Sequence, residues 1–214
     1  MADSPLPWLH WLGHASFRVE SHGLVIYFDP WKLKSSVPAD FVFITHDHTD
    51  HFSLEDLKRV SKPGTVVVCP GKVAARLTGY TVRAVQPGDD FDLGKLRGRA
   101  VASYNLRKPM HPRRAKNTGF ILDLPEGRLY HAGDTDFIPE MKDFTGLKAA
   151  LLPVGRVLFL RPTMGPKQAA EAVALMKPEY AVPMHYGSLP GSKGDGARFC
   201  KLVGARGVRM EREG

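Results

Sequence analysis

The segment Phe41-Val42-Phe43-Ile44-Thr45-His46-Asp47-His48-Thr49-Asp50-His51 is the strongest indication of how this chain folds and what it binds. Its first four residues are apolar and typical of a buried strand. The seven residues that follow contain three imidazoles and two carboxylates. Packing does not explain so many metal-binding side chains at the end of a strand. The segment therefore predicts a metal site, and the number of ligands indicates two ions.

The spacing inside this segment indicates how the ligands divide between ions. His46 and His48 are two residues apart, so in an extended segment both side chains lie on one face and can bind one ion. Asp50 and His51 follow a turn and precede a helix, so they can point to a second ion nearby. Imidazole and carboxylate ligands together suit zinc, iron or manganese.

Three further candidate ligands lie near the ends of expected strands. They are His111 in a loop after Lys108-Pro109-Met110, Asp134 in His131-Ala132-Gly133-Asp134, and His185 in Pro183-Met184-His185. A rigid strand that ends in a loop can deliver such a ligand to one edge of a sheet.

The rest of the chain alternates between expected strands and helices. Strands are predicted at 16–20, 24–28, 41–45, 65–69, 81–85, about 95–104, 119–123, 128–131, 149–154, 180–184 and 208–210. Helices are predicted at 54–60, with Ser53 as N-cap, and at 73–77, 166–176 and 197–203. The pattern predicts a layered α/β architecture in one domain over residues 1–214, with two halves that meet in one sandwich.

The composition is that of an ordinary globular protein, with 43% hydrophobic and 24% charged residues. No run of about 18 apolar residues occurs, so no membrane span is expected. The N-terminus lacks a basic region followed by an apolar core, so no secretory signal is predicted. Cys69 and Cys200 do not form a disulfide framework, and we expect a cytoplasmic protein.

The chain is basic, with 30 Lys and Arg against 22 Asp and Glu, a net charge of +8. Basic surfaces attract phosphates, nucleic acids and anionic substrates, although the same charge also serves solubility alone. The basic loop from Arg107 to Lys116 surrounds His111. Positive charge there favours a small anionic substrate, and a solvated surface is the alternative interpretation.

These residues together resemble the metallo-β-lactamase superfamily. Its His-x-His-x-Asp-His signature is present as His46, His48, Asp50 and His51, and the resemblance extends from Leu12-Gly13-His14-Ala15 to Pro183-Met184-His185-Tyr186-Gly187. Within the superfamily the chain looks most like the uncharacterised metal-dependent hydrolases related to L-ascorbate-6-phosphate lactonase. That closer match is carried by Gly133-Asp134-Thr135-Asp136, Thr163-Met164-Gly165-Pro166 and Met184-His185-Tyr186-Gly187.

The resemblance implies a four-layer αββα sandwich with a dinuclear site at one edge of the sheets. The ligands expected for the first ion are His46, His48 and His111. The ligands expected for the second ion are Asp50, His51 and His185, and Asp134 is expected to bridge the two. Zn²⁺ is the expected metal, with Mn²⁺ or Fe²⁺ as alternatives. Di-iron relatives that reduce oxygen carry a carboxylate where this chain has His48, so hydrolysis is expected.

The chemistry expected from two ions is hydrolysis by a hydroxide that bridges them. Asp50 is expected both to bind metal and to orient the attacking water. The bond attacked would be an ester, lactone or phosphoester of a small anionic substrate. One alternative is a phosphodiesterase acting on phospholipid or nucleic acid, although RNA-processing relatives carry a large extra domain. A second alternative is a non-catalytic metal-binding protein. A homo-oligomer is compatible with the sequence.

Several neighbours of the ligands are candidates for supporting a ligand or contacting substrate. The set is His14, Asp29, Asp136, Arg156, Arg161 and Tyr186. Asp29 is expected to orient a ligand by a hydrogen bond, and His14 to line the pocket or support a ligand. The run from Arg156 to Arg161 departs from the pattern of the close relatives. That difference puts in doubt any substrate preference inferred from the family.

Overall fold

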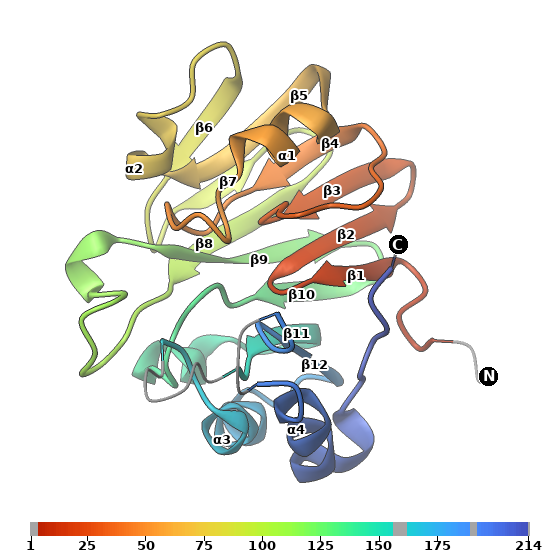
Figure 1. The fold of residues 1–214 in the computed structure, drawn as a ribbon, viewed down its shortest axis with the longest axis vertical. Helices are drawn as coiled ribbons and strands as arrows, with labels where there is room; N and C mark the ends of the chain where they lie inside the picture. Colours follow the sequence, from red (N-terminus) through yellow and green to blue (C-terminus); the bar gives the residue numbers. More distant parts are fainter. Residues whose placement is uncertain (1–3, 156–161, 189–191, 214) are drawn as a thin grey trace. The chain divides into compact units, whose positions relative to one another are not determined.

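The computed structural model describes residues 4–155, 162–188 and 192–213. The chain forms two compact units: unit 1 comprises Met1–Ala84 and Met210–Gly214, and unit 2 comprises Val85–Arg209. Figure 1 follows the chain from one to the other. The single domain over residues 1–214 stays a prediction.

Unit 1 contains a six-stranded sheet whose strands follow one another in chain order, β1-β2-β3-β4-β5-β6. The strands are β1 (Leu9–Gly13), β2 (Ser16–Ser21), β3 (Leu24–Phe28), β4 (Ala39–Phe43), β5 (Ser61–Pro70) and β6 (Thr81–Val85). β1, β2 and β3 pair antiparallel, whereas β3, β4 and β5 pair parallel. Helix α1 (Leu54–Val60) therefore crosses over between β4 and β5.

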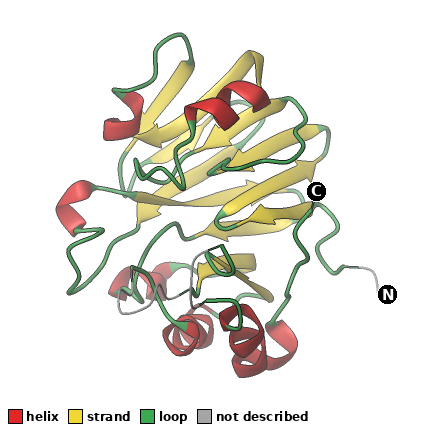
Figure 2. Cartoon of the chain, viewed as in Figure 1, coloured by secondary structure: helices red, strands yellow, loops and turns green. Residues whose placement is uncertain are grey.

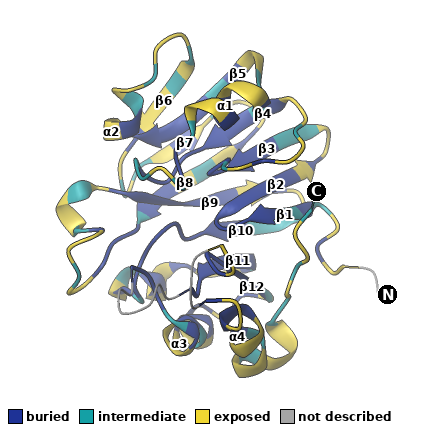
Figure 3. Cartoon of the chain, viewed as in Figure 1, coloured by how far each residue is buried: buried dark blue, intermediate teal, exposed yellow. Residues whose placement is uncertain are grey.

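The core of unit 1 lies between this sheet and its helices. Leu57 and Val60 of α1 pack with Val73 of α2 (Gly71–Ala74) and with Val42 and Val67 of the sheet. The first turn of α1 is capped as predicted, because the Ser53 hydroxyl accepts a hydrogen bond from the Asp56 backbone N–H at 3.1 Å. Figure 3 shows the buried strands of this sheet in dark blue.

Unit 2 contains a second six-stranded sheet, with the order β12-β11-β10-β9-β8-β7. Its strands are β7 (Asp90–Asp92), β8 (Arg97–Ala102), β9 (Thr118–Leu124), β10 (Gly127–His131), β11 (Leu147–Pro153) and β12 (Tyr180–Met184). β7 to β10 pair antiparallel, and β10, β11 and β12 pair parallel. Helices α3 (Pro166–Met176) and α4 (Asp195–Val203) lie side by side and contact β11 and β12, as Figures 1 and 2 show.

The C-terminal residues return to the first strand of unit 1. The Glu213 backbone N–H donates to the Trp11 carbonyl oxygen at 2.8 Å, and Arg212 Nε donates to the Leu12 carbonyl oxygen at 2.8 Å. The Glu213 carboxylate pairs with Arg18 at 2.7 Å. This tail therefore covers the turn that leads into His14.

Most predicted elements are confirmed, and several bounds coincide with the structure. The strands at 24–28, 81–85 and 180–184 and the helices at 54–60 and 166–176 have the predicted limits. The strand expected at 41–45 ends at Phe43 instead. The reason is that the Thr45 backbone N–H donates to Asp29 Oδ1 at 2.8 Å rather than to a neighbouring strand.

The prediction of a strand at 208–210 is wrong. Only isolated bridges occur there, at Gly207 and Arg212, and the Val208 backbone N–H donates to Ala181 without a ladder following. Two strands were not predicted. β7 is Phe91 between two aspartates, residues that disfavour strands, and β1 is interrupted by an irregularity between Trp11 and Gly13. Within the described residues, no helix has the length and apolarity needed to cross a membrane.

Candidate metal centre

In unit 1 the histidine-rich segment follows the end of β4. The backbone N–H groups of His51 and Phe52 both donate to the His48 carbonyl oxygen, at 3.0 and 2.8 Å. This tight turn ends just before the Ser53 cap of α1. The turn brings side chains that are five residues apart together, and the rings of His46 and His51 have centroids 4.1 Å apart.

Asp29, at the end of β3, is the hydrogen-bonding centre of this half of the site. Its carboxylate is fully buried. It accepts from the Thr45 backbone N–H at 2.8 Å and from the Thr45 hydroxyl at 2.7 Å. His51 Nδ1 lies 2.7 Å from Asp29 Oδ2 and donates to it, because a carboxylate only accepts. The pairing leaves His51 Nε2 as the nitrogen that can bind metal.

The same reasoning fixes the tautomer of His46. The Thr45 hydroxyl gives its single proton to Asp29, so it accepts from His46 Nδ1, which is 2.9 Å away. His46 Nε2 then carries a lone pair and lies 3.1 Å from His48 Nδ1. Two ligand nitrogens on one tetrahedral zinc ion are separated by about 3.3 Å, given Zn–N bonds of about 2.0–2.1 Å. This half of the site therefore fits a metal ion.

His14 and Asp50 form the other part of the unit 1 cluster. His14 Nε2 lies 3.1 Å from Asp50 Oδ2. The imidazole of His14 is buried and packs beside Trp31 and His51, with ring centroids 5.1 and 5.5 Å away. Its backbone has a positive φ of 53°, and Trp11 Nε1 donates to its carbonyl oxygen at 3.0 Å. The turn and these contacts therefore hold the His14 ring beside Asp50.

In unit 2 two histidines converge on one carboxylate. Asp134 Oδ2 lies 3.1 Å from His185 Nε2 and 3.5 Å from His111 Nε2. All three side chains are almost completely buried. Asp134 follows β10 and His185 follows β12, and these strands are parallel to β11 between them. Their carboxyl ends meet at one edge of the sheet, as the sequence predicted.

A close backbone approach holds His185 in place. His185 has a positive φ of 58°, and its carbonyl oxygen lies against Gly155. A Cβ atom at position 155 would lie only 1.7 Å from that oxygen, so only glycine fits there. No local pattern predicts this requirement, because the backbone that Gly155 approaches belongs to His185, 30 residues later in the sequence.

The other predicted site residues have different surroundings. Asp136 is buried and pairs with Lys108, and it accepts from the Leu106 backbone N–H at 3.0 Å. The ring of Tyr186 packs on Gly196 of α4, and burial raises the pKa of its hydroxyl. Arg156 and Arg161 lie outside the described residues.

The positive charge of the loop around His111 is partly compensated. Lys108 pairs with Asp136 and donates to the Thr163 carbonyl oxygen at 3.1 Å, and Arg113 pairs with Glu140 at 3.0 Å. Arg107 and Arg114 are exposed. The loop therefore contributes less free charge than its sequence indicates.

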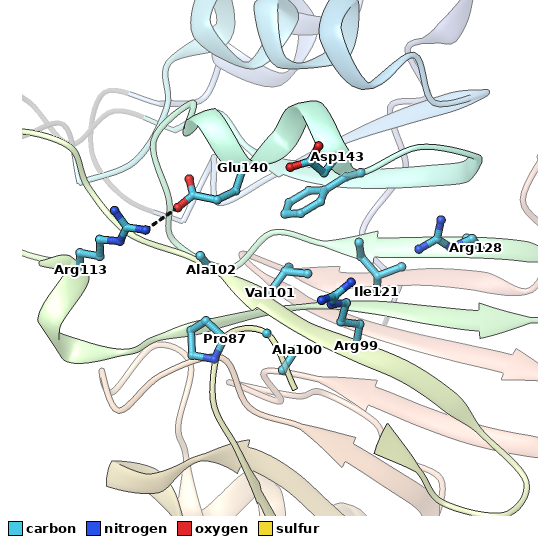
Figure 4. A pocket seen from close by; sticks show the side chains of 12 residues that line it. Pro87, Arg99, Ala100, Val101, Ala102, Arg113, Ile121, Arg128, Glu140 and Asp143 are labelled. Carbon is cyan, nitrogen blue, oxygen red and sulfur yellow. Dashed lines mark hydrogen bonds and ion pairs between the residues drawn. The ribbon is translucent and has the colours of Figure 1, made fainter. Parts of the chain in front are cut away.

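A separate cavity of about 480 Å³ lies over β8, β9 and β10 of unit 2. Figure 4 shows Arg113 pointing to Glu140, with Val101 and Ile121 below them. The three arginines that line the cavity, Arg99, Arg113 and Arg128, each pair with a carboxylate. Its lining includes none of the candidate ligands, so it is not part of the metal centre.

Comparisons with known proteins agree with these observations. A family model described as a beta-lactamase superfamily domain matches residues 8–185. A metal-dependent hydrolase of Methanopyrus kandleri is 32% identical over 219 residues, which cover 94% of this chain and 93% of that protein. Two solved structures are also similar. One, from Parabacteroides distasonis and described as a metal-dependent hydrolase, has a TM-score of 0.81 at 27% identity, covering 95% of this chain and 90% of its own. The other, a metallo hydrolase of Ignicoccus hospitalis, has a TM-score of 0.75 at 30% identity. The match covers 91% of this chain and 89% of that protein. These matches confirm the predicted α/β fold class.

Proposed function

The chain belongs to the metallo-β-lactamase superfamily and is a metal-dependent hydrolase of that fold, and we propose that it works with two divalent metal ions. His46, His48 and His111 would hold one ion, and Asp50, His51 and His185 the other, with Asp134 between them. Zn²⁺ is the metal proposed, with Mn²⁺ or Fe²⁺ as alternatives.

The observation that carries this proposal is the tautomer of the buried histidines. His46 and His51 each use Nδ1 as a donor to an oxygen acceptor, which leaves Nε2 as an available ligand. A buried imidazole needs a partner for Nδ1 whatever its role. The further indication of metal is that the other nitrogen of His46, Nε2, lies 3.1 Å from His48 Nδ1, close to the separation of two ligands on one ion. Divalent ions held by these residues would supply the chemistry of hydrolysis, because a metal-bound water has a lowered pKa and can act as hydroxide near neutral pH.

The protein's own residues then hold and orient the reactants. Asp29 fixes the ring of His51 and, through the Thr45 hydroxyl, that of His46. Asp50 is partly exposed, with 28% of its side chain accessible, so its carboxylate can both bind metal and contact the attacking water. His14, 3.1 Å from Asp50, holds that carboxylate.

The substrate class we propose is a small anion with an ester, lactone or phosphoester bond. Support comes from the net charge of +8 and from the exposed Arg107 and Arg114 in the loop that carries His111. Exposed guanidinium groups bind carboxylates and phosphates through paired hydrogen bonds. We place the protein in the cytoplasm.

The function is tested with His48→Ala and Asp134→Ala, measuring bound metal by elemental analysis and hydrolysis of lactones, phosphorylated esters and a bis-aryl phosphate. Wild-type protein should bind two equivalents and hydrolyse a lactone or ester, and each variant should lose metal and activity. The control is His22→Ala, an exposed histidine between β2 and β3.

Full hydrolysis by both variants would contradict the proposed mechanism. Turnover of the bis-aryl phosphate without turnover of lactones would identify a phosphodiesterase instead. A wild-type protein that binds metal but hydrolyses none of these compounds would support a non-catalytic metal-binding protein.

A further inference from the structure

We propose that Asn105 is a positioning residue that holds His111 ready to bind metal. The inference rests on the proposed function, because His111 is a metal ligand there. Asn105 follows β8 and is 4% exposed. Its surroundings, rather than its neighbours in sequence, indicate the role.

The hydrogen bonds of His111 define which ring nitrogen carries the proton. Nδ1 lies 3.1 Å from Asn105 Oδ1 and 3.1 Å from the Pro162 carbonyl oxygen. A carbonyl oxygen only accepts, so Nδ1 is the donor, and in a neutral imidazole Nε2 carries the lone pair. Nε2 is also the nitrogen that lies 3.5 Å from Asp134 Oδ2. The tautomer and the ring orientation are therefore those of a metal ligand.

The orientation of the Asn105 amide is itself fixed. Nδ2 donates to the Pro162 carbonyl oxygen at 2.9 Å, so Oδ1 must face His111. Oδ1 also accepts from the His111 backbone N–H at 3.2 Å, and the Asn105 N–H donates to the His111 carbonyl oxygen at 2.7 Å. Asn105 thus binds both the main chain and the ring of His111, so it fixes the ring relative to the backbone that carries it.

Other contacts dock the loop without touching the imidazole. Lys108 pairs with Asp136 and Thr163, and the Leu106 N–H donates to Asp136 Oδ2 at 3.0 Å. Loss of the Asn105 amide should therefore leave the loop in place. The expected defect is in the orientation and basicity of the His111 ring.

Metal binding needs the acceptor half of the amide, because Oδ1 is the atom that reaches the His111 ring. An aspartate could accept from His111 but could not donate to Pro162, and a leucine of similar size could do neither. Asn105→Asp should therefore retain metal binding, whereas Asn105→Leu should weaken it. Loss of a residue that orients a metal ligand typically lowers metal affinity by about 10–100-fold.

The experiment is a Zn²⁺ titration of the full-length wild-type, Asn105→Leu and Asn105→Asp proteins against a chromophoric chelator. We expect wild type to bind two ions, Asn105→Leu to bind one of them about 10–100-fold more weakly, and Asn105→Asp to resemble wild type. The visible spectrum of the Co²⁺-loaded proteins gives a second readout, since loss of one nitrogen ligand changes it. The matched control is Asn117→Leu, which removes another buried amide of unit 2.

The outcomes separate the inference from the function on which it rests. Wild-type protein that binds no Zn²⁺ would overturn both. Two tightly bound ions in wild type and equally tight binding in Asn105→Leu would overturn the inference alone. An equal loss of affinity in Asn105→Leu and Asn117→Leu would also overturn it, because the effect would then be general packing. The melting temperatures of the metal-free variants identify that case.

Discussion

The two units support their candidate metal-binding histidines with different chemical groups. In unit 1 the carboxylate of Asp29 accepts directly from His51 at 2.7 Å, and through Thr45 it also orients His46. In unit 2 His111 donates to an amide and a peptide carbonyl, both neutral and both 3.1 Å away. A carboxylate partner makes an imidazole a more basic ligand than a neutral partner does.

This difference indicates that the proposed ligands are not equivalent. His51 Nε2 should be a more basic ligand than His111 Nε2. The candidate ligands of unit 1 come from one short segment, whereas those of unit 2, His111, Asp134 and His185, come from three separate loops. Substitutions in one unit can therefore test its candidate ligands without changing those of the other unit.

The largest effect is expected for Gly155→Ala in unit 2. The new Cβ would lie 1.7 Å from the His185 carbonyl oxygen, which belongs to the backbone and cannot move alone. We expect the free energy of unfolding to fall by about 3 kcal/mol and binding by His185 to be lost. Urea denaturation and metal analysis measure the two effects. Gly194→Ala, where the added atom meets nothing within 4 Å, is the control in the same unit. Equal stability of the two variants would refute the prediction.

A second prediction concerns a substitution that gives His51 a neutral amide partner, the kind of partner that His111 has in unit 2. Asp29→Asn replaces the carboxylate by an amide at a position with a φ of 41°, which asparagine tolerates. One of its three donors then loses its acceptor, at a cost of about 1–3 kcal/mol. Affinity for the ion bound by His51 should fall by about 10–100-fold, as chelator titration will show.

The control for Asp29 is another buried carboxylate of unit 1. Asp56 accepts from the Lys32 and Leu33 backbone N–H groups at 2.7 and 3.2 Å and lies at the start of α1. Asp56→Asn should lower stability and leave metal affinity unchanged. If both variants lost metal equally, the carboxylate of Asp29 would act through stability alone.

The smallest effect concerns the cysteine in each unit. Burial raises the pKa of the Cys69 thiol in unit 1 to about 12, and it also raises the pKa of Cys200 in unit 2, which is only half-buried. At pH 8 a thiol with that pKa is thiolate in only about one molecule in ten thousand. Iodoacetamide should therefore alkylate Cys200 faster than Cys69, as mass spectrometry can measure. Equal rates would mean that the core of unit 1 opens readily.

The same shift has a consequence for stability. The folded state holds the Cys69 proton more tightly than the unfolded state, whose thiol has a pKa of 9.0. The contribution of the buried Cys69 thiol to the free energy of unfolding is complete below pH 9 and is lost as the pH rises toward 12.

The parts predicted from sequence are those specified by neighbouring residues. The strand, turn and capped helix around His46 to His51 lie within about twenty residues, so periodicity and capping were sufficient. β7 escaped prediction because pairing with β8, rather than the preference of Asp90 and Asp92, makes it a strand. Asn105 escaped because its partner Pro162 is 57 residues away, and no local pattern records such a contact.

The return of the C-terminal tail to β1 has a consequence for synthesis. Unit 1 is discontinuous in the chain, since its last residues follow all of unit 2. The Trp11 and Leu12 carbonyl oxygens therefore accept their hydrogen bonds from Glu213 and Arg212 only after the ribosome has made every strand of the second sheet. The turn that carries His14 is thus made before the second sheet and completed after it.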